Sequence, residues 1–306
     1  MKIVYFDDYR LGLVRGRDVV DVTDVVKDIP RMGPHDLITR LVERFPQYRG
    51  KLEAELARGA GIPLNKVQLK APTPKPGKIV CMAVNYMEDG TRKEPAPINA
   101  FLKSPRAVIG DGETVVLHKD NATTFEHEAE LGLVVGKQAT KVNAKDWRQY
   151  VFGYLNFIDV SSRGLGAPPS DSFFASKSPH TSAPLGPFLV TADEIPDPQH
   201  LKVNLWVNGE LRQDYNTDDM AHKLPRVIEW ASSITTLDPG DVVATGTNHW
   251  GLGPLMDNDK VEMEIEGLGR LRVSVKDDLH REWRRETHRQ RDAREAAEKK
   301  AAAGGA

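Results

Sequence analysis

Short apolar runs with strand-like spacing dominate the chain from Lys78 to about Lys276. They are separated by glycine, proline and aspartate and include KIVCMAV, ELGLVVG, LKVNLWVNG, DVVATGT, KVEMEIEG and RLRVSV. Many short strands with few long helices favour a curled or barrel-like mixed sheet. We therefore expect a β-rich α+β fold. A doubly wound nucleotide-binding fold is disfavoured because the chain contains neither GxGxxG nor GxxxxGK[ST].

The two ends of the chain have a different character from this central part. Residues 1–71 combine short alternating segments with helical spacing from His35 to Arg58, which predicts a small N-terminal α+β domain. The alternating prolines between Ala71 and Lys78 predict an extended connector, so we expect the catalytic domain to span residues 72–279. Residues 280–306 are charged and rich in alanine, which predicts a solvated helical or disordered tail that catalysis does not need.

Composition excludes several classes of protein. Lys plus Arg total 42 against 44 for Asp plus Glu, so no overall positive field would hold a nucleic acid. Charges interrupt every apolar stretch at the amino terminus, and no run reaches the roughly 18 apolar residues of a membrane span, so we expect neither a signal peptide nor membrane insertion. Cys81 is the single cysteine and lies in an apolar run, which fits an inert buried thiol and a cytoplasmic protein.

Two acidic segments suggest a metal site. Glu126, Glu128 and Glu130 fall at every second position of FEHEAELGLVVGK, so one continuous strand would place all three on one face. Such crowding is unfavourable unless a cation lies between the carboxylates, although a solvated edge strand is the simpler alternative. Asp159, in the aromatic segment GYLNFIDVSSR, favours the cation. Carboxylates without cysteine suit Mg²⁺ or Mn²⁺ better than zinc.

An ordered series of motifs over roughly residues 72–276 resembles the fumarylacetoacetate hydrolase superfamily, in particular its small bacterial members that act as isomerases or acylpyruvate hydrolases. The motifs are PKPGKIVCMAVNY, FLKSPRAVIG, FEHEAELGLVVGK, FGYLNFIDVSSR, KSPHTSAPLGPFLVT, VNGELRQDYNTDDM, LDPGDVVATGT and VEMEIEGLGRL. The resemblance implies a distorted β-roll core and a homodimer. It also implies that Glu128, Glu130 and Asp159 bind Mg²⁺ or Mn²⁺.

The same resemblance implies roles for further residues. Lys177 matches the family's active-site lysine, where its charge would stabilise an enolate. Thr247 matches a threonine that binds a substrate carboxylate. The remaining family positions near the substrate are Tyr86, Arg163 and Gln213.

The sequence departs from the family pattern close to the chemistry. Asp89 stands where the NYxxHxxE lid motif has its histidine, Ile158 replaces an asparagine, and His180 replaces an aspartate. An exposed aspartate is a weak base at neutral pH. His180 and His249 are therefore our candidates for the missing base, beside Asp89 itself.

The resemblance implies a metal-dependent enzyme that cleaves a C–C bond in a small 2-oxo acid of the acylpyruvate or dioxo type, because that is the commonest activity of the family. An isomerase, dehydratase or decarboxylase acting on the same substrate class is a close alternative, and the changed lid favours it because these reactions do not need an activated water. A non-catalytic binding or scaffold protein is the third possibility. Such a protein would gain nothing from crowded carboxylates.

Overall fold

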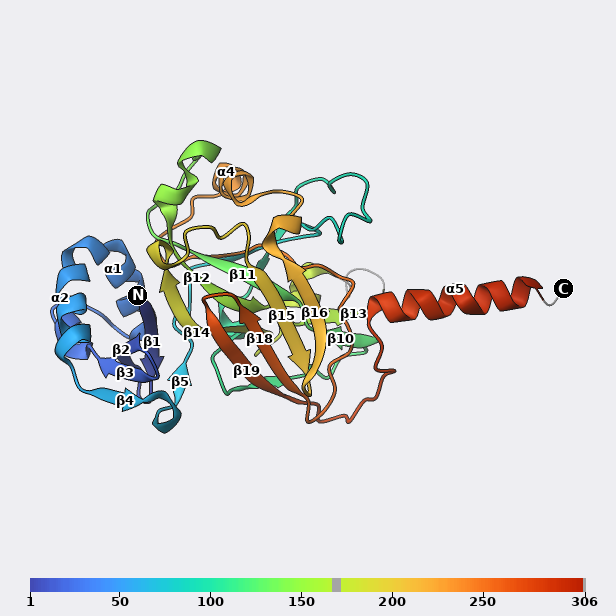
Figure 1. Ribbon diagram of the computed structural model, residues 1–306, viewed down its shortest axis with the longest axis horizontal. Coiled ribbons are helices and arrows are strands. Elements are labelled where there is room, and N and C mark those ends of the chain that lie inside the picture. Colours follow the sequence, from blue (N-terminus) through green and yellow to red (C-terminus); the bar gives the residue numbers. More distant parts are fainter. Residues whose placement is uncertain (167–171, 305–306) are drawn as a thin grey trace.

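One long mixed sheet runs from the N-terminal part into the centre of the molecule (Figure 1). The structure is a computed structural model that describes residues 1–166 and 172–304. The strands of this sheet follow the order β4-β3-β2-β1-β14-β12-β11-β17-β6-β7, with β5 paired to β1 and β8 to β14. Their bounds are β1 Lys2–Phe6, β2 Arg10–Arg15, β3 Asp18–Asp21, β4 Gly61–Pro63, β5 Leu69–Lys70, β6 Ile79–Met82, β7 Ala100–Lys103, β8 Val108–Ile109, β11 Ala129–Val135, β12 Val151–Ile158, β14 Ala183–Thr191 and β17 Val242–Ala244.

The N-terminal helices cover one end of this sheet. Helical spacing predicted one stretch from His35 to Arg58, but the structure has two helices, α1 (Pro34–Glu43) and α2 (Phe45–Arg58). Pro46 explains the break, because proline has no backbone N–H and would interrupt the hydrogen bonds of a continuous helix. In the first turn of α2, where it stands, a backbone N–H would have no partner within the helix, so proline is tolerated there. Side chains of α1 and β1 belong to the same buried cluster as residues of β12 and β14, so the N-terminal and central parts share a core.

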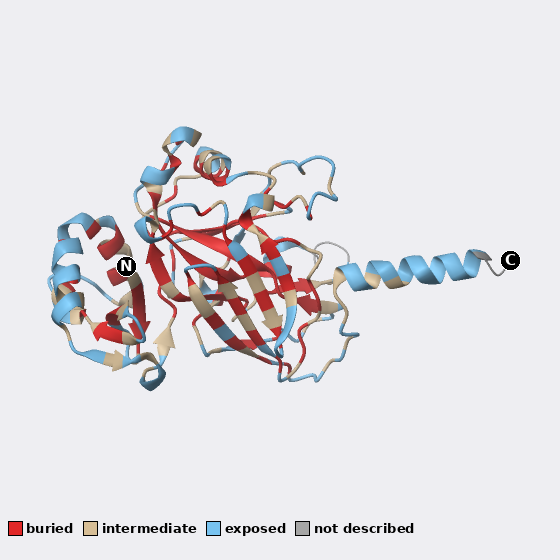
Figure 2. Ribbon diagram, viewed as in Figure 1, coloured by how far each residue is buried: buried red, intermediate tan, exposed pale blue. Residues whose placement is uncertain are grey.

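A second sheet packs against the central strands in the order β16-β15-β18-β19-β9. Strand β18 shows why the period-two pattern predicts strands: its alternate residues Val261, Met263 and Ile265 are buried (Figure 2). A short pair, β10 and β13, completes the strands of the described residues. The bounds are β9 Thr114–Val116, β10 Thr124–Glu126, β13 Ser161–Arg163, β15 Lys202–Val207, β16 Glu210–Asn216, β18 Lys260–Ile265 and β19 Gly269–Lys276.

Three more α-helices lie outside the sheets of the described residues. They are α3 (Phe173–Lys177), α4 (Leu224–Ile234) and α5 (His288–Gly304). Helix α5 projects away from the body of the molecule and is exposed along most of its length (Figures 1 and 2). None of the helices within residues 1–166 and 172–304 has both the length and the hydropathy that crossing a membrane requires.

Candidate active site

The pairing of β11 with β12 brings three carboxylates together. The register places Ala129 opposite Ile158, so Glu128 and Asp159 face each other just beyond the ladder, where the Asp159 N–H donates to the Glu128 carbonyl at 2.8 Å. Glu130 lies in β11, two residues after Glu128 in the sequence. One carboxylate oxygen from each of the three residues lies within 4.8 Å of the others, and all three side chains are buried.

The expectation of one strand face carrying three glutamates is wrong for Glu126. The strand is interrupted: β10 ends at Glu126 and β11 begins at Ala129. Glu126 instead accepts hydrogen bonds from Arg163 Nε at 2.8 Å and pairs with His288 Nε2 at 2.6 Å. The third acid of the cluster is Asp159, as the motif series implied.

Two buried lysines and one arginine surround these acids. Lys177 Nζ, at the end of α3, lies 2.7 Å from Glu128 Oε2 and 2.9 Å from Asp159 Oδ2. Arg163 Nη2 donates to the other oxygen of Glu128. Lys103, at the end of β7, lies 2.6 Å from Asp159 Oδ1. We did not expect Lys103 from the sequence. It stands in FLKSPRAVIG, so membership of a matching motif was the signal that could have found it.

The cations do not neutralise the three acids equally. Burial, with the charges of Asp159 and Glu128 added, raises the pKa of Glu130 well above that of an ordinary glutamate. Burial also opposes ionisation of Glu128, but Lys177 and Arg163 outweigh it, so the pKa of Glu128 is lowered. Glu128 is therefore ionised, while Glu130 holds its proton to higher pH. A further positive charge at the cluster would be balanced by loss of that proton.

The chemistry of the donors fits a hard divalent cation. The candidate ligands are all carboxylate oxygens, and neither histidine nor cysteine belongs to the cluster that the described residues form. Three carboxylates leave coordination positions for water or a chelating substrate, which is the arrangement that Mg²⁺ and Mn²⁺ prefer.

Metal binding is expected to release a proton from Glu130 and to strengthen as the pH rises. Calorimetric titration with Mn²⁺ in buffers of different ionisation enthalpy measures the released proton directly. The Glu130→Gln variant has no proton to release and should bind the ion weakly. If the wild type binds Mn²⁺ without proton release on either side of neutral pH, Glu130 is already ionised and this account of the cluster is wrong.

The metal-free protein should show the matching effect on stability. A folded-state pKa above the value of about 4.3 for an unfolded glutamate means that the folded state binds more protons between the two values. The free energy of unfolding of the metal-free wild type should therefore decrease as the pH rises through that window. Glu130→Gln removes the titrating group, so its pH dependence should be flatter in thermal unfolding.

The loop after β17 ties the acids to a set of hydroxyl and amide groups. The Gly246 N–H donates to Glu130 Oε2 at 2.7 Å, and a side chain at this left-handed glycine (φ 83°) would press on Asn85 and Met82. The next residue, Thr247, accepts a hydrogen bond from Gln213 Nε2 at 2.8 Å. Thr247 thus lies next to the acid cluster, as the motif series implied.

Gln213 is held in one orientation by its neighbours. Its Oε1 accepts from the Ala129 N–H and faces His127 Nδ1, both at 3.1 Å. Burial lowers the pKa of His127 to about 4, so this histidine is neutral and donates through Nδ1. Tyr86 is fully buried with its ring edge-on to Tyr215 at 5.0 Å, and its hydroxyl has no hydrogen-bond partner within the part of the chain that the structure describes.

A carboxylate and a histidine from distant loops meet beside the site. His249 Nδ1 lies 2.6 Å from Glu88 Oε1, and the His249 N–H donates to Glu88 Oε2 at 2.8 Å. Glu88, Asp89 and Gly90 have φ values of 58°, 54° and 75°, a left-handed turn that is unfavourable for the two acids. The two hydrogen bonds from His249 and the packing around them hold this turn. Sequence spacing could not reveal the pair, since 161 residues separate its members.

The other two candidate bases have different surroundings. Asp89 is exposed and pairs with Arg289 at 2.8 Å. His180 is exposed on the turn after α3, and its ring makes no hydrogen bond or ion pair among residues 1–166 and 172–304. Of the three candidates, only His249 is joined to a buried carboxylate.

The first part of the C-terminal segment lies against the site. The His288 N–H donates to the Leu252 carbonyl at 2.9 Å and the Arg289 N–H to the Trp250 carbonyl at 3.1 Å. The His288 ring reaches Glu126, which binds Arg163, which in turn binds Glu128. These contacts oppose the expectation that the whole tail is dispensable.

Two truncations are expected to separate the roles of the tail. A chain ending after Leu279 loses His288 and leaves the buried Glu126 with one partner fewer, so its activity should fall by about 10-fold or more. A chain ending after Ala293 keeps every contact described above and should retain full activity. Equal activity of the two chains, measured with the same metal loading, would show that the segment does not support the site.

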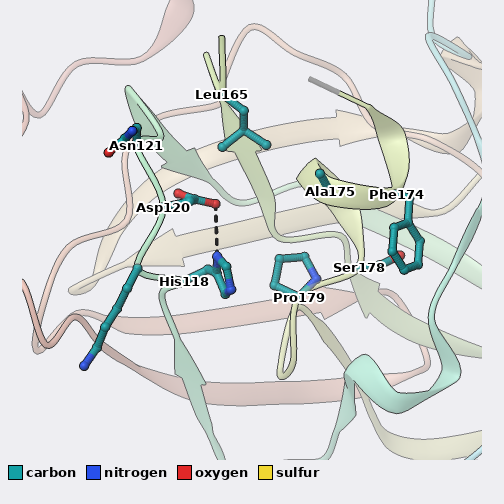
Figure 3. Close-up of a pocket in the computed structure, with 9 residues that line it drawn as sticks. His118, Asp120, Asn121, Leu165, Phe174, Ala175, Ser178 and Pro179 are labelled. Carbon is teal, nitrogen blue, oxygen red and sulfur yellow. Dashed lines mark hydrogen bonds and ion pairs between the residues drawn. The ribbon is translucent and has the colours of Figure 1, made fainter. Parts of the chain in front are cut away.

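Two surface hollows of about 450 Å³ each lie near these elements. Figure 3 shows the first, beside α3, where His118 faces Asp120 at 3.2 Å and Phe174 and Pro179 form the opposite wall. The residues of the acid cluster do not line it. The second hollow is lined by both Glu88 and His249.

Comparison with known proteins decides the family. The family model for the C-terminal domain of fumarylacetoacetate (FAA) hydrolase matches residues 78–276. The chain belongs to the fumarylacetoacetate hydrolase family. The expected family and β-rich fold are thereby confirmed, and so is the expectation of an enzyme.

Relatives extend the match to nearly the whole chain. Maleylpyruvate hydrolase of Aquipseudomonas alcaligenes is 36% identical over 90% of this chain and 99% of the relative. The maleylpyruvate hydrolase of Sphingobium sp. SYK-6, solved with manganese(II) and pyruvate, is 37% identical with a TM-score of 0.82, covering 90% of this chain and 99% of that one. Oxaloacetate tautomerase of Bacillus subtilis (strain 168) is 38% identical over 68% of this chain and 73% of the relative. With the acid cluster, the manganese complex of this relative bears out the expected cofactor, Mg²⁺ or Mn²⁺.

Proposed function

We propose that this family member is a metal-dependent hydrolase that cleaves a C–C bond of an acylpyruvate-type acid. The observation that carries the proposal is the pairing of Glu88 with His249 beside the three-carboxylate cluster. Hydrolysis needs both an electrophilic cation and a base for water, and the described residues offer carboxylate ligands for the first and His249 for the second. The complex of the Sphingobium relative with manganese(II) and pyruvate supports the substrate class.

Each part of the substrate has a natural position in this arrangement. A divalent ion held by Glu128, Glu130 and Asp159 would supply Lewis-acid polarisation of the 2-oxo group. The Thr247 hydroxyl, oriented by Gln213, would hold the substrate's 1-carboxylate. Lys177 keeps its positive charge because Asp159 and Glu128 raise its pKa against the effect of burial, so it would stabilise the enolate that forms.

His249 would move the protons. Its Nδ1 faces Glu88, which leaves Nε2 to accept a proton from water. The water oxygen then bonds to the acyl carbon, and the bond from that carbon to C3 of the pyruvate unit breaks. The electron pair passes into the pyruvate enolate, and His249 returns the proton to C3. The products are pyruvate and a carboxylic acid.

Tautomerisation or isomerisation is the second candidate function. The similarity to the Bacillus subtilis oxaloacetate tautomerase supports it, because the same base could move a proton between carbon and oxygen without adding water. A non-catalytic scaffold explains neither the buried carboxylate cluster nor the strained Glu88 turn. A homodimer in the cytoplasm stays a prediction.

Product analysis separates the two functions. Purified protein with Mn²⁺ is incubated with a panel of acylpyruvates and with the enol form of oxaloacetate, and products are identified by mass spectrometry. Hydrolysis yields two fragments whose masses sum to substrate plus water, whereas isomerisation leaves the mass unchanged. A panel in which no acylpyruvate is fragmented while an isomer accumulates would reject the hydrolase in favour of the second function.

A further inference from the structure

Residues 280–289 form a strap that lies across the catalytic domain and ends beside the candidate active site. Near its start, Arg281 pairs with Asp277 at 3.0 Å, and further along Arg285 Nη1 lies 3.1 Å from Oδ2 of Asp259. Both aspartates are buried, so their ion pairs with the strap are shielded from water. The strap is therefore held along its length by acids of the domain.

The far end of the strap binds the left-handed turn that begins at Glu88. Arg289 Nη2 lies 2.8 Å from an oxygen of Asp89, and the Arg289 guanidinium lies 5.7 Å from the centre of the Trp250 ring. The Trp250 indole N–H donates in turn to the Glu88 carbonyl at 3.1 Å. Arg289 thus contacts the turn directly through Asp89 and indirectly through Trp250.

This turn brings three acids together. The Asp89 N–H donates to Asp219 Oδ2 at 3.1 Å, and Glu88 directly precedes Asp89. Burial, and after it the charges of Asp89 and Glu88, raise the pKa of Asp219. In the described part of the chain, Arg289 is the one lysine or arginine that forms an ion pair with any of these acids. It therefore offsets repulsion that would otherwise open the turn.

The partner of Asp89 lies outside the family domain. Asp89 occupies the position of the lid histidine in the family pattern, whereas the match to the family model ends at residue 276. The residue that replaces the histidine is thus paired with a segment that the family model does not include. One position earlier, Glu88 binds the ring and the backbone N–H of His249 at 2.6 and 2.8 Å. Movement of the turn would separate Glu88 from His249.

We propose that Arg289 is a positioning residue, which holds the turn through Asp89 so that Glu88 orients the His249 ring for proton transfer. This inference rests on the proposed function, which assigns the base to His249. Arg289 itself would touch neither the substrate nor the metal ion. Loss of the ion pair should therefore lower kcat and leave KM nearly unchanged, because the metal ion and Thr247 would still hold the 2-oxo acid.

Hydrogen exchange of the turn tests the contact without requiring turnover. Deuterium uptake of residues 86–92 is followed by mass spectrometry on the full-length, Mn²⁺-loaded protein. Arg289→Gln should speed exchange there by about 2- to 5-fold, the range expected for an exposed ion pair, and Arg289→Lys should restore most of the protection. Arg291→Gln is the matched control, because it removes the same charge two positions away from an arginine paired with Asp292. It should exchange as the wild type does.

A double-mutant cycle assigns the effect on turnover to the ion pair. Asp89→Asn keeps the size of the side chain and suits the left-handed backbone, so it should lower kcat by about the same factor as Arg289→Gln. The double variant should be no slower than either single variant, because no ion pair is left to remove. Wild-type exchange in Arg289→Gln, or losses of kcat that simply add, would overturn the proposal. Coupled losses in a protein that isomerises acylpyruvates without cleaving them would uphold Arg289 and reject the proposed hydrolase.

Discussion

The Glu128→Gln variant is expected to lose metal-dependent turnover while remaining folded. Glutamine keeps the size of the side chain but removes the charge that would hold the ion. Loss of a residue that only supports a metal ligand lowers metal affinity by up to about 100-fold, so loss of the ligand's charge itself should lower Mn²⁺ affinity by more than about 100-fold. Lys177 and Arg163 each lose an anionic partner as well, so the metal-free variant should unfold at a lower temperature than the wild type.

Calorimetric titration with Mn²⁺ measures this effect, with thermal unfolding as the test of the fold. Glu210→Gln is the matched control, since Glu210 is an exposed acid that pairs with Arg212 and does not belong to the cluster. The control should bind Mn²⁺ as the wild type does. Wild-type Mn²⁺ affinity in Glu128→Gln would exclude the three-carboxylate cluster as the metal site.

The second large effect is expected at His249. His249→Asn should lower kcat/KM by about 10² to 10⁴, the usual contribution of a general base, and leave Mn²⁺ affinity unchanged. The base must be neutral to accept a proton, so the wild-type rate should fall toward acid pH and the variant should lack this fall. Glu88→Gln should give a smaller loss, because it changes the orientation of the ring rather than removing it.

His180→Asn is the control for this prediction, because His180 is an exposed histidine without side-chain partners among the described residues. It should retain full activity and the wild-type pH profile. If His180→Asn abolishes turnover and His249→Asn does not, the assignment of the base must be exchanged between them.

The local pattern of apolar residues and the order of the motifs were sufficient to predict many of the strands and the three carboxylates. Period-two burial in strands such as β18 follows directly from alternating side chains, and the motif series located Glu128, Glu130 and Asp159 as a set. Their closeness depends on the register of β11 with β12, which no local pattern specifies. The partners of Glu126, Arg163 and His288, likewise come from distant parts of the chain.

The parts that sequence analysis missed are all long-range contacts. Lys103 reaches Asp159 across 56 positions, Glu88 reaches His249 across 161, and His288 reaches Glu126 across 162. Each residue type is common on protein surfaces, so none draws attention alone. A charged, alanine-rich tail indicates solvent exposure, which is true of most of α5, but the pattern could not show that the residues around His288 pack on the site.

Oxygen-18 labelling tests the central claim most directly. The Mn²⁺-loaded protein is incubated with an acylpyruvate in water enriched in oxygen-18, and the products are analysed by mass spectrometry at early times. Our account predicts unlabelled pyruvate together with a carboxylic acid that carries one oxygen-18 atom, because water adds to the acyl carbon before the C–C bond breaks. Recovery of a product with the mass of the substrate and no incorporated label would contradict hydrolytic cleavage.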